Sequence, residues 1–190
     1  MRAQTSQPIH EVIAKRRSPR SLNQAHELTD ADLLAILEAA RWAPSAMNMQ
    51  PWRFIVGKRG DGVFNKILEA LNPNNVPWAK NSSALILTLG EKIRADGQPY
   101  GDFKYDCGLA VSQMVFETHS RGLIAHQMTG FSRDKATQIF EVASNLEPVV
   151  VVAIGEQDAP EKLEGVLYER EIAPRARKPL SELVIEGLPS

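Results

Sequence analysis

The sequence predicts a mixed α and β fold, rich in helix, within a single domain of 190 residues. Several segments repeat apolar residues at the spacing of one helix face, and three short apolar runs have the length of strands. No internal repeat, low-complexity stretch or Gly/Ser-rich linker divides the chain. A chain of this length buries about 70% of its unfolded surface on folding, so its core needs no disulfides.

Five segments are predicted to be helical from their apolar spacing and from the residues that end them. In chain order they are 9–17, 29–43, 64–71, 102–121 and 132–140. Pro19 ends the first, because proline disfavours helix at the preceding residue, and Gly122 is a natural C-terminal cap for the fourth. Ser132 is expected to cap the fifth. The residues expected to be buried in the first helix are Ile9, Val12 and Ile13.

The second and fourth helices carry long apolar stripes. Thr29 and Asp32 resemble an N-terminal capping box, with Asp in place of the usual Glu or Gln. The stripe of the second helix consists of Leu33, Ile36, Leu37 and Ala40. The stripe of the fourth consists of Phe103, Cys107, Ala110, Val111, Met114 and Val115. The small residues Gly108 and Ala110 are expected to let another helix approach closely.

Strands are predicted at 52–57, 84–90 and 149–155, with a shorter fourth at 123–127. The runs 85–87 and 149–152 are apolar without alternation, so both faces of these strands should be covered. We therefore expect them at the centre of a sheet between helices.

Charge and composition exclude several classes of protein. The net charge of −1 argues against a protein that coats nucleic acid or an anionic membrane through its overall field. A single cysteine, Cys107, excludes a disulfide framework and a cysteine-rich zinc site, and it favours a reducing compartment. The apolar runs are far shorter than the ~18 residues of a membrane span, and the polar segment 1–8 is not a secretory signal. A cytoplasmic location is the resulting prediction.

The two ends of the chain are expected to differ from the body of the domain. Residues 1–8 are predicted to be a flexible N-terminus, and 156–190 a C-terminal extension. Within the extension, 179–187 regains apolar residues after a charged stretch. Such a segment should dock either on its own domain or on a second subunit.

Known catalytic motifs are missing from the sequence. It contains no G-x-G-x-x-G or phosphate-loop pattern, no G-x-S-x-G elbow, and no H-x-x-x-H spacing among its four histidines. The polar segment 57–62 is interpreted as a turn, and Cys107, on an apolar stripe, as a packing residue. The chemistry must therefore come from a borrowed cofactor, or the protein is not a catalyst.

Two basic clusters stand out in this nearly neutral chain. Residues 15–20 hold four cations in six positions, and 170–178 hold four in nine. Each cluster is either a solvated face or part of a phosphate site, for which guanidinium groups are suited. If the clusters converge, they make a pocket for one phosphate dianion.

The segment 43–52, between a predicted helix and a strand, is dense in amide and hydroxyl groups and contains two prolines. It is either a rigid connection or a ligand-binding loop. In the second case Ser45 and Asn48 would offer hydrogen bonds and Met47 an apolar contact.

Together these segments resemble the nitroreductase family of FMN-dependent oxidoreductases. The resemblance covers nearly the whole chain and rests on six motifs in the family's order: RRSPR (16–20), APSAMNMQPW (43–52), DCGLAVSQ (106–113), GLIAHQMTGF (122–131), LEPVVVVAIG (146–155) and RARKPL (175–180). It implies an α+β fold whose central, mostly antiparallel sheet is flanked by helices. It also implies a homodimer with FMN at the subunit interface, built largely on the helix 102–121, and a C-terminal extension that docks on the partner subunit.

The resemblance also implies roles for individual residues. The FMN phosphate and ribityl chain would be held by Arg16, Arg17, Ser18, Arg20, Arg175 and Arg177. The same flavin would be reached from the other subunit by Pro44, Ser45, Ala46 and Asn48. The isoalloxazine ring would be lined by Gln127, Met128, Thr129 and Gly130, with a backbone N–H near Thr129 or Gly130 directed at flavin N5.

The chemistry implied is transfer of a hydride from NADH or NADPH through flavin N5 to a nitroaromatic, a quinone or a similar acceptor. No side-chain acid or base is required, in agreement with the missing motifs. Ala46 and Met49 depart from the family's usual serines. The segments 72–78 and 91–101 are short and leave the substrate pocket undefined. Trp78, Tyr100 and Phe103 are candidates to line it, although core packing is the expected role of at least Phe103.

Two alternative functions remain open at the level of sequence. One is a specialised enzyme of the same fold, a dehalogenase or a flavin-fragmenting enzyme. The other is a non-enzymatic module whose basic clusters contact nucleic acid, with strongly salt-dependent binding. The physiological acceptor and the choice between NADH and NADPH are not predicted.

Overall fold

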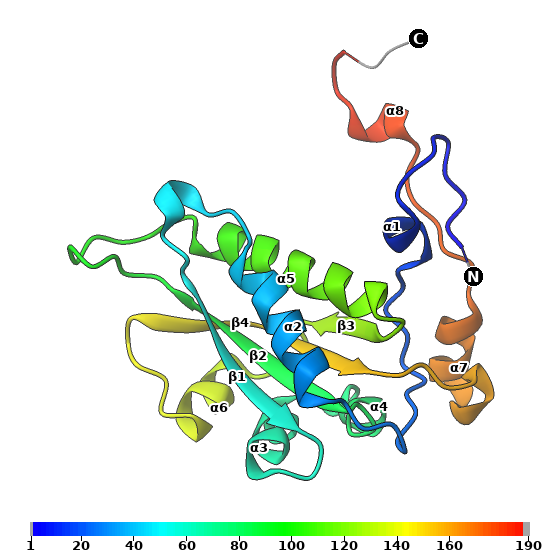
Figure 1. Cartoon of the computed structure of the whole chain (residues 1–190), viewed down its shortest axis with the longest axis horizontal. Helices are drawn as coiled ribbons and strands as arrows, with labels where there is room; N and C mark the ends of the chain where they lie inside the picture. The colour runs from blue at the N-terminus through cyan, green and yellow to red at the C-terminus, as the bar shows by residue number, and fades with distance from the viewer. Residues whose placement is uncertain (1, 188–190) are drawn as a thin grey trace.

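The computed structural model describes residues 2–187, so the outermost residues of the predicted N-terminus and C-terminal extension (1 and 188–190) lie outside the described residues. A four-stranded sheet lies at the centre, between two layers of helices (Figure 1). Its strands are β1 (Trp52–Lys58), β2 (Ala84–Glu91), β3 (Ile124–Met128) and β4 (Leu146–Gly155), in the order β1-β2-β4-β3. All neighbouring strands are antiparallel. The predicted α+β class is confirmed.

The two strands without alternation, β2 and β4, are the central pair, as predicted. Leu85 and Leu87 of β2 face one core cluster, and Ile86, between them, faces the other. Both faces of the strand are apolar because both are covered by helices. The sheet is therefore the middle layer of three.

One helical layer consists of α2 (Asp30–Arg41) and α5 (Phe103–Ser120), and the other of α3 (Gly62–Ala70), α4 (Val76–Ala79) and α6 (Arg133–Ile139). The apolar stripe predicted for α5 is buried. Its small residues lie on different sides, however, because Ala110 is in the core whereas a Cβ on Gly108 would meet open space. Of these two small residues, Gly108 is therefore the one on the outer face of the helix.

Helix ends follow the predicted capping residues. Thr29 Oγ1 accepts the Asp32 N–H at 3.0 Å, and Ser132 Oγ accepts the Lys135 N–H at 3.2 Å. Gly122 has a φ of +76°, the left-handed conformation of a C-terminal cap. The Asp32 carboxylate accepts from the Thr29 hydroxyl rather than from its backbone N–H, so the capping box is incomplete.

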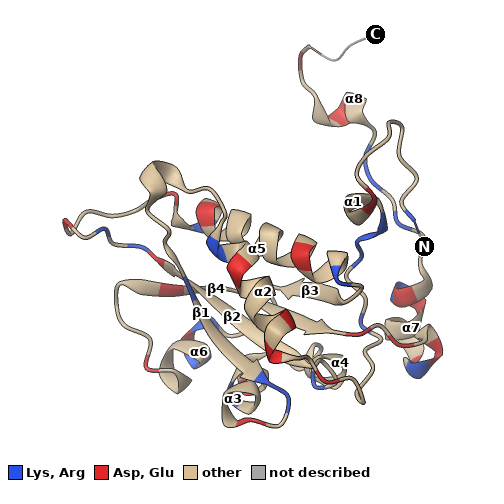
Figure 2. Ribbon diagram, viewed as in Figure 1, with Lys and Arg blue, Asp and Glu red and all other residues tan. Residues whose placement is uncertain are grey.

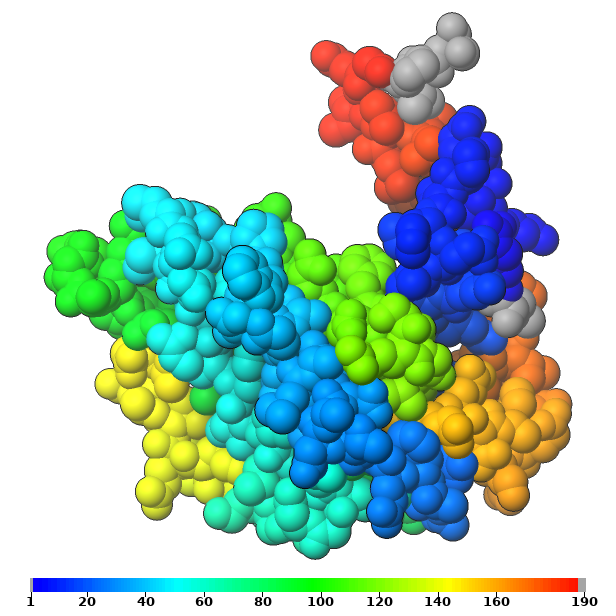
Figure 3. All heavy atoms as spheres, viewed as in Figure 1, coloured from blue at the N-terminus to red at the C-terminus, as the bar shows by residue number. Residues whose placement is uncertain are grey.

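The two ends of the chain run together away from the sheet (Figures 1 and 3). We call this part the terminal arm: residues 2–15, with α1 (Glu11–Lys15), and 174–187, with α8 (Leu180–Leu183). The ends are joined where the Arg175 guanidinium donates to the Ala14 carbonyl at 2.9 Å. The extension reaches the arm through a 3-10 helix, η2 (Pro160–Lys162), and α7 (Gly165–Ile172).

The prediction that the first helix buries its isoleucines is wrong. Ile9 is 39% exposed and Ile13 45% exposed, and Ala14 is the buried residue of α1. The reason is position: α1 lies on the arm, beyond the two helical layers, so its apolar face has no sheet to cover.

Candidate functional site

Arginines from both ends of the chain meet at one cavity of about 560 Å³ on the terminal arm. We call it the arginine cavity, and Arg16, Arg175 and Arg177 line it together with Lys178. Figure 2 shows basic segments of both chain ends along the arm. No Asp or Glu is among the residues that line it. The structure therefore brings together three of the predicted phosphate residues.

The cavity is strongly positive. Burial lowers the pKa of Arg16, and repulsion from Arg175 and Arg177 lowers it further. The pKa of Arg175 is lowered in the same way, by burial and by Arg177 and Arg17. Within residues 2–187 none of the three cavity arginines has a carboxylate within 4.0 Å. Since guanidinium groups stay charged at any physiological pH, the cavity suits an anion.

Ser18 lies beside this cavity, because its Oγ accepts from Arg16 Nη1 at 3.2 Å. Arg17 and Arg20 do not line it. Arg17 Nη2 donates to the Glu171 carbonyl at 2.5 Å, and the Arg20 backbone N–H donates to Glu171 Oε2 at 2.8 Å. The Arg20 guanidinium lies 5.8 Å from the Trp78 ring centroid. Glu171, a buried residue of α7, thus binds Arg17 and Arg20, whereas Arg16 lines the arginine cavity.

Two histidines, His119 and His126, lie close to the segment 16–20. His126 Nδ1 donates to the Pro19 carbonyl at 2.9 Å, and its ring lies against Trp78 with centroids 4.4 Å apart. Burial lowers the pKa of His126 to about 4 and that of His119 to about 4, and Arg16 contributes to both. Both histidines are therefore neutral at pH 7. Among the described residues no group of three His, Cys, Asp or Glu side chains is placed to hold a metal.

The residues predicted to line the flavin ring lie at the end of β3 and just beyond it. Gln127 is half-buried, Met128 is buried and Thr129 is exposed. The Gly130 carbonyl accepts from the Asn72 N–H at 3.0 Å and from Asn75 Nδ2 at 2.9 Å. A Cβ on residue 130 would lie 2.7 Å from Asn75 Nδ2, so any larger residue there would displace the Asn75 side chain from this contact.

The loop predicted to approach a flavin lies between α2 and β1 and contains a short 3-10 helix, η1 (Ala46–Asn48). Pro44, Ala46 and Asn48 are exposed and Ser45 is half-buried. Met47, Asn48 and Gln50 have φ near +50°, a left-handed conformation that side chains disfavour. Ser45 Oγ holds the loop by accepting the Gln50 N–H at 3.0 Å.

This loop and the terminal arm lie at opposite ends of α5 (Figure 1). The 18 residues of α5 span about 27 Å at 1.5 Å per residue. Within one chain, therefore, the structure does not bring Pro44, Ser45, Ala46 and Asn48 to the arginine cavity.

Comparison with known proteins shows what this arrangement is similar to. The sequence profile of the nitroreductase family matches residues 13–85. An uncharacterised 15.4 kDa protein of Mycolicibacterium smegmatis is 33% identical over 146 residues, which cover 71% of this chain and 95% of that protein. A protein of Archaeoglobus fulgidus, provisionally named NADH dehydrogenase/NAD(P)H nitroreductase, is 28% identical over 148 residues, covering 76% and 82%. A solved structure of an oxidoreductase containing FMN superposes with a TM-score of 0.92 at 32% identity, covering 98% of this chain and 95% of that one.

The chain belongs to the nitroreductase family. The match to the solved structure extends over both chain ends, so the arm is part of the shared fold. In the described part of this nitroreductase-family chain, no helix has the length and hydropathy to cross a membrane.

Sequence reasoning missed several residues that hold the site of this family member together. Asp106 is buried, and its Oδ2 accepts the Ala46 N–H at 3.2 Å and the Tyr100 hydroxyl. Burial and Asp106 raise the pKa of Tyr100 to about 12. The sequence does not predict the roles of Asn75 and Glu171 either. Asn75 lies in a run of turn-forming residues and Glu171 in a charged helix, and neither pattern indicates a distant hydrogen-bond partner.

The three residues suggested for the substrate pocket lie in the interior of the chain, as expected for Phe103. Trp78, Tyr100 and Phe103 are all buried. Tyr100 is hydrogen bonded to Asp106, and Trp78 packs against His126. Cys107 is fully buried, and burial raises its pKa to about 12, which confirms its interpretation as a packing residue.

Proposed function

We propose that this chain is an FMN-dependent oxidoreductase that uses NADH or NADPH to reduce a nitroaromatic, quinone or similar acceptor. The observation that carries the proposal is the arginine cavity, with its three arginines and no carboxylate in the lining. Its charge fits the phosphate of FMN, and the family assignment supplies the cofactor class. FMN, when bound, supplies hydride transfer between a nicotinamide and an acceptor.

The chain's own residues would bind and orient the cofactor. Arg16, Arg175 and Arg177 would hold the phosphate through charge-assisted hydrogen bonds, with Ser18 beside them. Arg17 and Arg20 would fix the segment 16–20 through Glu171. Because Asn72 and Asn75 both bind the Gly130 carbonyl, the backbone at Thr129 and Gly130 is held in one orientation. A fixed backbone N–H donor there needs no rearrangement during the reaction.

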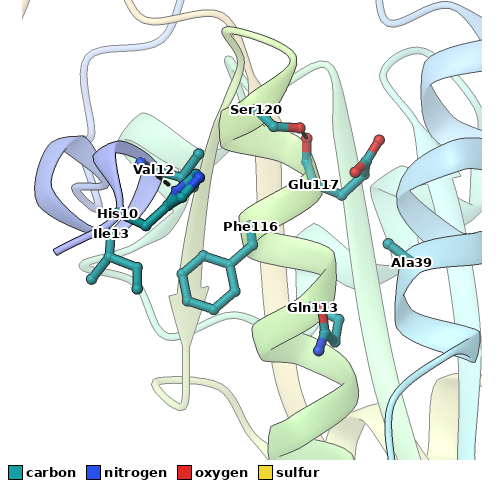
Figure 4. Close-up of a pocket in the computed structure, with 8 residues that line it drawn as sticks. All are labelled: His10, Val12, Ile13, Ala39, Gln113, Phe116, Glu117 and Ser120. Carbon is teal, nitrogen blue, oxygen red and sulfur yellow. Dashed lines mark hydrogen bonds between the residues drawn. The ribbon is translucent and has the colours of Figure 1, made fainter.

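A second copy of the chain would complete the site. The exposed loop residues Pro44, Ser45, Ala46 and Asn48 would reach the flavin of the partner subunit, since they lie too far from their own arginine cavity. A hollow of about 300 Å³, which we call the apolar hollow, lies between α1 and α5. Ile13 and Phe116 form its apolar side, and polar residues of α5, including Glu117, complete the lining (Figure 4). The exposed Leu180, Leu183 and Ile185 of the arm add apolar surface for the same partner.

The cytoplasmic location inferred from the single cysteine remains a prediction.

The visible absorption spectrum of the purified protein tests the proposal. We expect flavin bands, bleached by NADH or NADPH without oxygen and restored by an acceptor. A colourless protein that takes up no added FMN would overturn it. A panel of nitroaromatics, quinones and halogenated phenols then separates a general reductase from the specialised alternative. Binding to DNA that falls steeply with salt, without flavin, would favour the nucleic-acid module.

Replacing an arginine of the cavity tests the phosphate assignment. Arg16→Ala or Arg177→Ala should weaken FMN binding about ten- to a hundredfold, the range for one charged hydrogen bond. Arg2→Ala is the matched control, since Arg2 is on the same arm but pairs with Glu11 at 2.8 Å. Fluorescence titration of apoprotein with FMN measures the affinity. Unchanged affinity in either variant would remove that arginine from the site.

A further inference from the structure

Backbone hydrogen bonds tie the C-terminal extension to the chain directly after the segment 16–20. The Asp158 N–H donates to the Ser21 carbonyl at 3.0 Å, and the Asn23 N–H donates to the Glu156 carbonyl at 3.0 Å. Such bonds form whatever side chains these positions carry. They fix where the segment ends, but not how the residues within it are directed.

Within the segment, the backbone of Arg20 is held by a side chain. Its N–H donates to Glu171 Oε2 at 2.8 Å, across 151 residues of sequence. The main-chain carbonyl of Glu171 also accepts from Arg17 Nη2 at 2.5 Å. One residue of α7 therefore holds two members of the segment, while Arg16 lines the arginine cavity.

The surroundings of the Glu171 carboxylate are unfavourable for a charge. The residue is 2% exposed, and its Oε1 has no hydrogen-bond partner among residues 2–187. In the same part of the chain, no Arg, Lys or His nitrogen lies within 4.0 Å of the carboxylate. A buried charge without an ion-pair partner is generally less stabilising than an apolar side chain of similar volume. The stability of the fold therefore does not account for a carboxylate here.

The charge of Glu171 does not help the arginine cavity to bind an anion either. A negative group repels a phosphate, so through its field alone Glu171 weakens phosphate binding. Its contribution must come from geometry. We propose that Glu171 is a positioning residue, whose Oε2 holds the Arg20 N–H and thereby directs Arg16 at the bound phosphate. The effect on FMN rests on the proposed function, whereas the effect on the segment does not.

Two substitutions separate position from charge. Glu171→Met removes both the acceptor and the charge, whereas Glu171→Gln removes the charge but keeps an oxygen that accepts the Arg20 N–H. We expect FMN to bind about tenfold more weakly to Glu171→Met, and within about threefold of the parent to Glu171→Gln. Fluorescence titration of the apoprotein measures both. Equal affinities of the two variants, whether above or below that of the parent, would overturn the proposal.

Glu169→Met is the matched control, because Glu169 is exposed on the same helix. The same change of side chain there should alter FMN affinity by less than about twofold, since an exposed charge contributes little. A loss as large as that of Glu171→Met would show that any change on α7 weakens binding, and would remove the specific role of Glu171.

Hydrogen exchange of the apoprotein supplies a readout that does not need FMN. The backbone amides of 16–22 should exchange about tenfold faster in Glu171→Met, at nearly the parent rate in Glu171→Gln, and those of β2 should be unchanged. A rise that includes β2 would make Glu171 a residue of the fold alone and overturn the positioning role. If only the segment loosens, in a protein that takes up no FMN, the proposed function fails and the positioning role stands. If FMN binds and the segment exchanges alike in all variants, the reverse holds.

Discussion

His126 illustrates how one neutral side chain positions a charged segment. Its Nδ1–H donates to the carbonyl of Pro19, a residue that stands between Arg16 and Arg20 in the sequence. Burial and these arginines keep the imidazole uncharged, with a pKa of about 4. A protonated ring at this position would add a third cation beside these two half-buried arginines. The neutral form is therefore required by the fold.

This requirement predicts a loss of stability in mild acid. The pKa of His126 is about 4 in the folded chain against 6.5 for an ordinary histidine, so between these values the unfolded state binds more protons. Stability is then complete above pH 6.5 and falls towards pH 4, by at most about 1.4 kcal/mol per pH unit for this group. His119, whose pKa is also lowered to about 4 by burial, acts in the same direction. Urea unfolding of the apoprotein between about pH 7 and about pH 5 measures the effect.

His126→Gln serves as the control for that pH dependence, because an amide still donates to the Pro19 carbonyl but does not titrate. Its unfolding free energy should vary less with pH over the same window. The carboxyl groups with lowered pKa values titrate below about 4.5 and so do not interfere. Identical pH profiles for parent and variant would show that His126 is not the cause.

Among elements, α5 joins the parts of the site that are far apart. Near its N-terminal end, Asp106 accepts the Ala46 N–H of the exposed loop and the Tyr100 hydroxyl of the segment 91–101. Left-handed conformations at Met47, Asn48 and Gln50 are each unfavourable by about 1 kcal/mol or more, so the loop needs such an anchor. We infer that Asp106 is a positioning residue for the loop.

Asp106→Asn is expected to weaken FMN binding about tenfold while leaving a folded chain, because a neutral amide oxygen accepts the two hydrogen bonds of Asp106 Oδ2 more weakly than a carboxylate does. FMN titration measures the affinity, and the visible circular dichroism of the bound flavin reports its orientation. Tyr100→Phe removes the hydroxyl contact alone and should affect FMN binding less. If Asp106→Asn loses thermal stability but binds FMN like the parent, with the same flavin spectrum, the residue is structural only.

At the scale of the whole molecule, the terminal arm and the outer face of α5 carry apolar surface that one chain leaves uncovered. Phe116 points from α5 towards α1 across the apolar hollow (Figure 4). The arm beyond it has no sheet beneath its exposed leucines. Association of two copies would cover both surfaces and bring each loop to the other's arginine cavity.

Phe116→Asp should therefore convert a dimer into monomers and weaken FMN binding in parallel, because a charge in the apolar hollow opposes its burial. Sedimentation velocity measures the association. Gln138→Asp, exposed on α6 in the opposite helical layer, is the control and should remain a dimer. A parent protein that sediments as a monomer with bound FMN would contradict the proposed assembly.

Most elements and their layering could be predicted from the sequence. Apolar spacing is a local property, so the stripe of α5 and the unalternating strands β2 and β4 could be read directly, and the terminal arginines could be matched to a family motif. Only the tertiary structure decided which cations share a cavity. Glu171 binds Arg17 and Arg20 across about 150 residues of sequence, and Asn75 binds Gly130 across 55. Hydrogen bonds between such distant residues form only in the folded chain. Local residue spacing does not predict them, because it does not indicate which polar groups the fold brings together.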